Sequence, residues 1–219
     1  MAEIDTTQQR IQIKLVYYGP ALSGKTTNLT RLHDLLAPDL KGEIMALETQ
    51  GDRTLFFDLF PLGFRLPSGW LVKFKLYTVP GQIVHDATRK AVLSRADGVV
   101  FVADSQRNQQ TNNGESFRNL GENLRRVGID IEQLPLVLQY NKRDLDNIED
   151  EATLRTRWAT APWPLLFASA LRGDGVIATF SALLEQLYPV LDAEADLADT
   201  HRCSSAEFVA AALGQGVRP

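Results

Sequence analysis

Cysteine is the scarcest residue in the sequence, since Cys203 is the only one among 219 residues. A single thiol excludes an internal disulfide. Long apolar runs are also absent, and no window approaches the roughly 20 residues of a membrane-crossing helix. The first ten residues, MAEIDTTQQR, lack the apolar segment of a secretory signal. We therefore expect a soluble protein of the cytoplasm.

Clusters of one charge or of metal ligands are missing as well. The formal net charge is −4, from 23 Lys and Arg against 27 Asp and Glu, and no long basic stretch occurs. A nucleic-acid partner is therefore not expected. The three histidines, His33, His85 and His201, are too dispersed for a zinc site. The hydrophobic share of 44% is that of an ordinary globular protein with a substantial core.

Short apolar runs alternate with helical patterns along the chain, which is typical of a parallel sheet covered by helices. Extended segments are expected in residues 11–18, 42–48, 70–79, 98–104, 134–142 and 164–170. Helical spacing of apolar residues begins at Leu29, Phe117 and Val176. The run TLFFDLFPLGF, residues 54–64, is also apolar at strand spacing.

The character of the sequence changes near residue 190. We assign residues 1–190 to the main domain and residues 191–219 to an acidic linker followed by a short amphipathic helix. Ser204 and Glu207 have the spacing of a capping box at the start of that helix. Its apolar face could dock on the domain, bind a partner or touch a membrane. Membrane contact is the least favoured, because the segment carries few cations.

The segment GPALSGKT, residues 19–26, follows an apolar strand and precedes a helix. It matches the P-loop pattern, in which glycines let backbone N–H groups face phosphates at a helix N-terminus. Lys25 would neutralise phosphate charge, and the Thr26 hydroxyl would bind Mg²⁺. The predicted phosphate-binding residues are Gly19, Ala21, Leu22, Ser23, Gly24, Lys25, Thr26, Thr27 and Gly81.

The segment NKRD, residues 141–144, resembles the guanine motif of Ras-like GTPases. Asp144 can accept hydrogen bonds from the N1–H and N2 amine of guanine, which adenine cannot supply together. Asn141 could serve the purine edge or brace the P-loop, and the Lys142 stem could lie over the ring. The segment ASA, residues 168–170, would bring a backbone N–H to the base O6. The predicted guanine-binding residues are Asn141, Lys142, Asp144, Ser169, Ala170 and Leu171.

The switch motif is unusual, because Thr78 stands where small GTPases normally carry an Asp. Gly81 can still donate to a γ-phosphate, and Gln82 can still orient the attacking water. Thr78 cannot supply an anionic partner to the Mg²⁺ shell, although its hydroxyl could hold one of the metal's waters.

Five segments together resemble the MglA-type bacterial small GTPases, which set cell polarity and gliding motility. They are VYYGPALSGKTTNL, DRTLFFD, LYTVPGQ, DGVVFVADSQ and QYNKRDL. In that family Thr is the normal residue of the switch motif. The resemblance implies that Arg53 is an arginine finger, Thr54 a switch residue on Mg²⁺ and Gln82 the catalytic glutamine. It also implies GTPase-activating and effector partners of the MglB or polarity-regulator type, which could recruit the protein to a cell pole.

Three features leave alternatives open. Ala21 occupies a P-loop position where the family prefers Gly, so its methyl group could crowd the transition state and slow hydrolysis, or the loop could shift without effect. Residues 54–64 could form a strand that slides between nucleotide states, as the resemblance implies, or could simply belong to the core. Without the family, Arg53 could equally pair with Asp52 or Asp58.

The sequence therefore predicts a P-loop NTPase of the small-GTPase fold, with a mostly parallel six-stranded sheet and helices on both faces. The predicted function is that of a GTPase switch that binds GTP and GDP and uses Mg²⁺, with Gln82, Arg53 and Lys25 as catalytic residues. The alternative is a GTP-binding scaffold with little hydrolysis. An ATP-dependent kinase is disfavoured by the NKRD segment.

Overall fold

A single sheet forms the centre of the fold in the computed structural model, which describes residues 2–43, 45–47, 57–79 and 86–215. The strand order is β3-β4-β5-β2-β6-β7-β8, and β1 pairs with the start of β2. The strands are β1 (Glu3–Asp5), β2 (Arg10–Tyr18), β3 (Met45–Leu47), β4 (Phe57–Arg65), β5 (Leu71–Thr78), β6 (Gly98–Asp104), β7 (Leu136–Asn141) and β8 (Leu165–Phe167).

The sheet is mostly parallel, as the sequence predicts. Strands β5, β2, β6, β7 and β8 run parallel, while β1, β3 and β4 join through antiparallel pairs. The prediction of six strands is wrong, because the described residues alone form a sheet of eight strands. Strand β1 is a polar tripeptide without an apolar pattern, and β3 and β4 together extend the antiparallel edge. On β4, Phe60, Leu62 and Phe64 are buried, so this part of the run belongs to the core.

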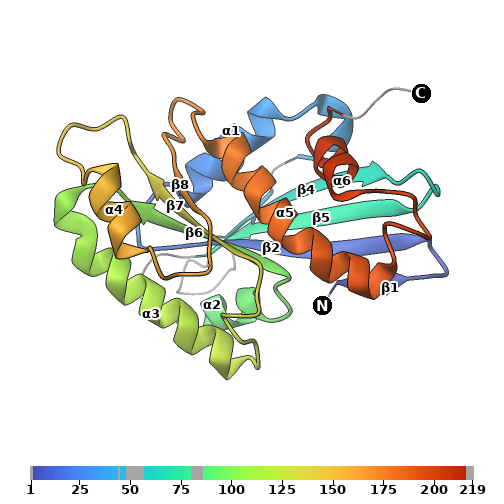
Figure 1. Cartoon of the computed structure of the whole chain (residues 1–219), viewed down its shortest axis with the longest axis horizontal. Coiled ribbons are helices and arrows are strands. Elements are labelled where there is room, and N and C mark those ends of the chain that lie inside the picture. The colour runs from blue at the N-terminus through green and yellow to red at the C-terminus, as the bar shows by residue number, and fades with distance from the viewer. Residues whose placement is uncertain (1, 44, 48–56, 80–85, 216–219) are drawn as a thin grey trace.

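Helices cover both faces of the sheet, as predicted (Figure 1). Helices α1, α5 and α6 pack on one face, and α2, α3 and α4 pack on the other. Each helix contributes apolar side chains to one of two cores that the sheet separates. The helices are α1 (Lys25–Leu35), α2 (Asp86–Leu93), α3 (Gln110–Arg126), α4 (Glu151–Arg157), α5 (Val176–Ala195) and α6 (Ser205–Ala212), with short 3₁₀ turns at η1 (Pro38–Leu40) and η3 (Arg107–Gln109).

The parallel pairing brings four loops to one edge of the sheet. These loops follow β2, β6, β7 and β8, whose carboxyl ends are aligned by pairs such as Asp104 with Asn141 and Tyr140 with Phe167. Strand β2 lies between β5 and β6. The strands that follow it directly in the chain, β3 to β5, lie on one side of β2, and the later strands β6 to β8 lie on its other side. Ligands of open α/β sheets bind at such a point.

The C-terminal segment packs against the domain. Helix α5 continues to Ala195, so the first part of the expected linker is helical and the predicted boundary at residue 190 falls inside α5. Ser204 and Glu207 form the predicted capping box at the start of α6. The Phe208 ring is buried and lies 5.4 Å from that of Phe64 and 6.0 Å from that of Phe74. Of the three uses considered for the segment, docking on the domain is observed.

Replacing Phe208 with Ala should remove a large part of this contact. We expect Phe208→Ala to lower the free energy of unfolding by about 3–5 kcal/mol, because the ring is lost from a fully buried site. Urea unfolding measures the change, and Leu35→Ala is the matched control because Leu35 is exposed. Equal, small effects of both substitutions would show that α6 adds nothing to the core.

Candidate functional site

At two glycines of the P-loop, Gly19 and Gly24, a side chain would collide with neighbouring atoms, so no other residue fits unless the loop or those atoms move. Gly19 follows β2, and a Cβ atom there would lie 2.1 Å from the Val102 carbonyl oxygen. Gly24 precedes α1 with a φ of 94°, and its Cβ would lie 2.3 Å from the Asn141 Nδ2 atom. The loop thus passes close to β6 and β7 and turns sharply into the helix. This is the backbone course that turns consecutive N–H groups toward phosphates.

Lys25 begins α1 and is buried inside the loop. Its Nζ atom donates to the carbonyl oxygens of Gly19, at 3.0 Å, and Pro20, at 2.6 Å. Burial, with a smaller effect from the Arg89 guanidinium, lowers the pKa of Lys25 to about 7. An ammonium group held in so dry a site would gain strongly from an anion, and phosphate oxygens would provide one.

The other loop residues differ in their surroundings. The Ser23 hydroxyl is buried and has no hydrogen-bond partner among the described residues. Ala21, Thr26 and Thr27 are exposed, and Leu22 is 88% exposed with a φ of 62°. The loop thus has a backbone course that depends on Gly19 and Gly24 and a buried Ser23 hydroxyl without a partner among the described residues. Both features fit a phosphate-binding loop.

Asn141 connects this loop to the segment that follows β8. Its Nδ2 atom donates to the Ser23 carbonyl oxygen, and its Oδ1 atom accepts from the Ala170 backbone N–H, both at 2.9 Å. Of the two roles left open for Asn141, the structure therefore shows the bracing of the P-loop. The predicted phosphate and guanine segments thereby lie side by side.

Asp144 lies in the loop after β7, next to Ser169. The Ser169 hydroxyl donates to Asp144 Oδ1 at 2.6 Å, and this bond is the largest reason why the pKa of Asp144 is lowered. The carboxylate is thus ionised and suited to accept hydrogen bonds from a guanine edge. Leu171, next in this segment, is exposed, and its carbonyl oxygen accepts from Arg31.

The backbone N–H expected to meet the base O6 already has a partner at each of the three predicted positions. The amides of Ala168, Ser169 and Ala170 donate to Tyr140, Asp174 and Asn141 respectively. A contact of the Ala170 N–H with O6 would therefore have to share or replace its bond to Asn141.

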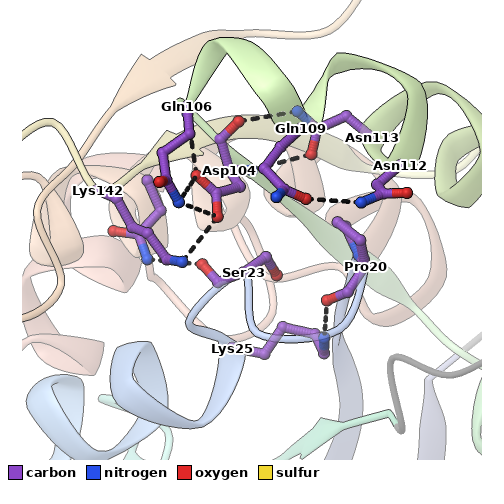
Figure 2. Close-up of polar contacts among 10 residues, drawn as sticks. Pro20, Ser23, Lys25, Asp104, Gln106, Gln109, Asn112, Asn113 and Lys142 are labelled. Carbon is purple, nitrogen blue, oxygen red and sulfur yellow. Dashed lines mark hydrogen bonds and ion pairs between the residues drawn. The ribbon is translucent and has the colours of Figure 1, made fainter. Parts of the chain in front are cut away.

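Lys142 has a φ of 68° and turns its ammonium group toward the sheet (Figure 2). There its Nζ atom lies 2.7 Å from Asp104 Oδ2. Asp104 is a site residue that the sequence analysis did not single out. A signal existed, because an acidic residue ends the otherwise apolar segment GVVFVAD.

The remaining predicted residues divide into two groups. Thr78 ends β5 opposite Tyr17 of β2, and it is buried beside the P-loop strand. Arg53, Thr54, Gly81 and Gln82 lie outside the described residues.

A cation site built from protein side chains alone is not found in the part of the chain that the structure describes. No group of three His, Cys, Asp or Glu residues there could hold a metal ion. Thr26, in the first turn of α1, is exposed and directly follows Lys25 of the predicted phosphate loop. Such a site fits Mg²⁺, which commonly binds proteins through one or two ligands and takes its remaining ligands from nucleotide phosphates and water.

Two buried polar groups support the site and were not predicted. Gln139 of β7 donates to Asn28 of α1 at 2.9 Å and to Thr179 of α5 at 2.8 Å, which ties both helices to the sheet. Arg89 of α2 is buried and donates to Asn119 of α3 at 2.6 Å. Neither residue belongs to a motif, so the sequence carries no signal for them.

No protein-family model matches the chain. One curated protein, the mutual gliding-motility protein MglA of Myxococcus xanthus (strain DK1622), is 45% identical over 183 residues. The alignment covers 84% of this chain and 94% of the relative. Within the described ranges, no helix is both long and apolar enough to cross a membrane.

Proposed function

The chain belongs to the MglA family of small GTPases, and we propose that it works as a switch through the residues gathered at the ends of β2, β6, β7 and β8. It binds guanine nucleotides and hydrolyses GTP. The observation that carries the proposal is the double hydrogen bond of Asn141, which joins the phosphate loop to the base segment.

The residues that we propose for the phosphate side are those predicted from the sequence: Gly19, Ala21, Leu22, Ser23, Gly24, Lys25, Thr26, Thr27 and Gly81. In our proposal the loop N–H groups and Lys25 hold the phosphates, and Thr26 and Thr54 bind Mg²⁺. When bound, Mg²⁺ would neutralise charge on the β- and γ-phosphates. In the same proposal the Thr78 hydroxyl holds one of the metal's waters. The buried Lys25 supports this assignment, because its ammonium needs an anionic partner.

The base side consists of Asn141, Lys142, Asp144, Ser169, Ala170 and Leu171. Asp144 would accept from N1–H and the N2 amine of guanine, and Ser169 would hold its carboxylate in place. A site built around such paired bonds rejects a base that lacks them, because its own polar groups are then left unpaired.

Hydrolysis requires that a water oxygen form a bond to the γ-phosphorus while the bond to the bridging oxygen breaks. We propose that the Gln82 carboxamide orients this water and that Arg53 neutralises charge on the transferred group and on the leaving GDP. The water proton leaves with the phosphate product. Lys25 would stabilise the same charge.

The cellular role that we propose is a nucleotide-dependent switch in bacterial polarity or motility, acting in the cytoplasm. The support is the similarity to the mutual gliding-motility protein MglA of Myxococcus xanthus. Activating and effector proteins of the MglB or polarity-regulator type would read the state of residues 49–60 and 78–88 and could recruit the protein to a cell pole.

Single-turnover hydrolysis of bound GTP in the presence of Mg²⁺ tests the catalytic assignment. We expect Arg53→Ala to lower the rate about 10³- to 10⁵-fold, as for other arginine fingers, and Gln82→Ala to lower it strongly as well. Arg65→Ala is the matched control, because it removes the same type of side chain at an exposed position. Arg65 lies at the end of β4 and donates to the Gly69 carbonyl oxygen of the turn that leads to β5. A slow wild-type rate that neither variant changes would favour the GTP-binding scaffold instead.

Ala21 supplies a separate test, because its methyl group stands in the loop next to Pro20, whose carbonyl binds Lys25. We expect Ala21→Gly to raise the single-turnover rate roughly ten-fold, which corresponds to about 1.4 kcal/mol of relieved crowding in the transition state. Ala206→Gly makes the same chemical change at an exposed position of α6 and should leave the rate unchanged. An Ala21→Gly rate equal to that of the wild type would show that the loop accommodates the methyl group.

A further inference from the structure

Asp104 is a buried carboxylate at the centre of the site, and neither the phosphate motif nor the guanine motif includes it. It ends β6, directly beside Asn141 in the sheet register. Asn113 holds its backbone from both sides, since the Asn113 side chain accepts from the Asp104 N–H at 3.0 Å and donates to its carbonyl oxygen at 2.8 Å. The fixed backbone leaves the carboxylate little freedom to move.

The carboxylate itself has two further partners (Figure 2). Gln106 donates to Oδ1 through its backbone N–H at 3.0 Å, and its side-chain amide donates to Oδ1 at 3.2 Å and to Oδ2 at 3.1 Å. Oδ2 also lies 2.7 Å from the Lys142 ammonium. The Asp104 side chain is 5% exposed, whereas that of Lys142 is 27% exposed. The buried Asp104 carboxylate is thus the fixed member of this ion pair, and it holds the longer, partly exposed side chain of Lys142.

The position of Lys142 gives this restraint a consequence for the nucleotide. Lys142 lies between Asn141, which binds the P-loop, and Asp144, which faces Ser169. A lysine here has a flexible stem of four methylene groups, and an unrestrained stem would lose rotamer freedom when a base packs on it. Because Asp104 holds the ammonium group, much of that entropy is already lost before a nucleotide binds.

We propose that Asp104 is a positioning residue for the purine base: it anchors the Lys142 ammonium group so that the lysine stem forms a fixed apolar platform for one face of the ring. The inference rests on the proposed function, because it takes residues 141–144 to be the base site. Asp104 acts through Lys142 and makes no contact with the nucleotide in this account. The resulting contact is with the ring face and is therefore indifferent to the N2 amine.

The test is the dissociation rate of a fluorescent GDP from the Mg²⁺-loaded protein after addition of excess unlabelled GDP. We expect Asp104→Asn to increase this rate about three- to ten-fold, the effect of leaving one long side chain to be immobilised by the ligand. The matched control is Asp97→Asn, which makes the same change to a buried carboxylate just before the opposite end of β6, where it accepts from the Lys14 N–H. This control should leave the dissociation rate unchanged, whatever it does to stability.

Two further readouts separate positioning from a purely structural role. In the Lys142→Met background, Asp104→Asn should add no further increase, because there is no ammonium group left to anchor. Competition with unlabelled nucleotides should show the same fold-loss of affinity for GDP and for inosine diphosphate, which lacks the N2 amine. An additive effect in the Lys142→Met background, or a loss confined to GDP, would overturn the inference.

The single variants also guard against a folding defect. If Asp104→Asn does not fold, Lys142→Met must by itself raise the dissociation rate of GDP, and a wild-type rate in that variant would overturn the inference. A wild-type protein that retains fluorescent GDP, combined with equal rates for Asp104→Asn and Asp97→Asn, would refute the role of Asp104 alone. A wild-type protein that does not retain fluorescent GDP would refute the proposed base site, and the inference with it.

Discussion

The side chain of Asn141 is hydrogen-bonded in two directions, to the Ser23 carbonyl oxygen of the P-loop and to the Ala170 N–H after β8. Both bonds are buried, so the loss of either would leave a polar group without water to replace its partner. The close passage of Gly24 under Asn141 leaves no room for a Cβ atom, which makes the loop course and the asparagine dependent on one another. The segments predicted to bind the phosphates and the base are therefore braced against each other at the carboxyl ends of the strands.

The residues around Asn141 differ in their proposed role from those that would carry out hydrolysis. Around the predicted phosphate loop the described residues supply hydrogen-bond donors. Burial lowers the pKa of Lys25 there, so an anion beside it would stabilise its charged form. The groups proposed to act on the γ-phosphate, Arg53 and Gln82, come from segments outside the described residues. Recognition of the base by residues 141–144 and orientation of the attacking water by Gln82 are thus proposed for different parts of the chain. A protein with Ala21 and Thr78 would therefore bind guanine nucleotides even where its hydrolysis is slow.

Much of the fold follows from local patterns in the sequence. The alternation of Val72, Phe74 and Leu76 with lysines predicts β5 and its buried side, and all three side chains are buried. The capping box of α6 is likewise predicted from the local sequence, because Ser204 and Glu207 are only three positions apart. Helix α4 was not predicted, because it has seven residues and buries only Leu154, which is too little for a periodic signal.

The site could be predicted to the extent that it consists of contiguous motifs. The loop of residues 19–26 and the segment of residues 141–144 were identified from the sequence, and the sheet brings them together. The sequence does not predict the roles of Asp104, Arg89 and Gln139, because each depends on a partner 30 or more positions away along the chain. The pairing of Lys142 with Asp104 is of this kind, since no spacing rule connects the ends of two adjacent parallel strands.

Displacement of bound fluorescent GDP by unlabelled GTP and by ATP, in the presence of Mg²⁺, tests the central claim that these segments form a guanine-nucleotide site. GTP should displace the probe at a concentration at least about 10³-fold lower than ATP, because adenine leaves Asp144 without its paired donors. Displacement by ATP and GTP at similar concentrations would contradict the claim.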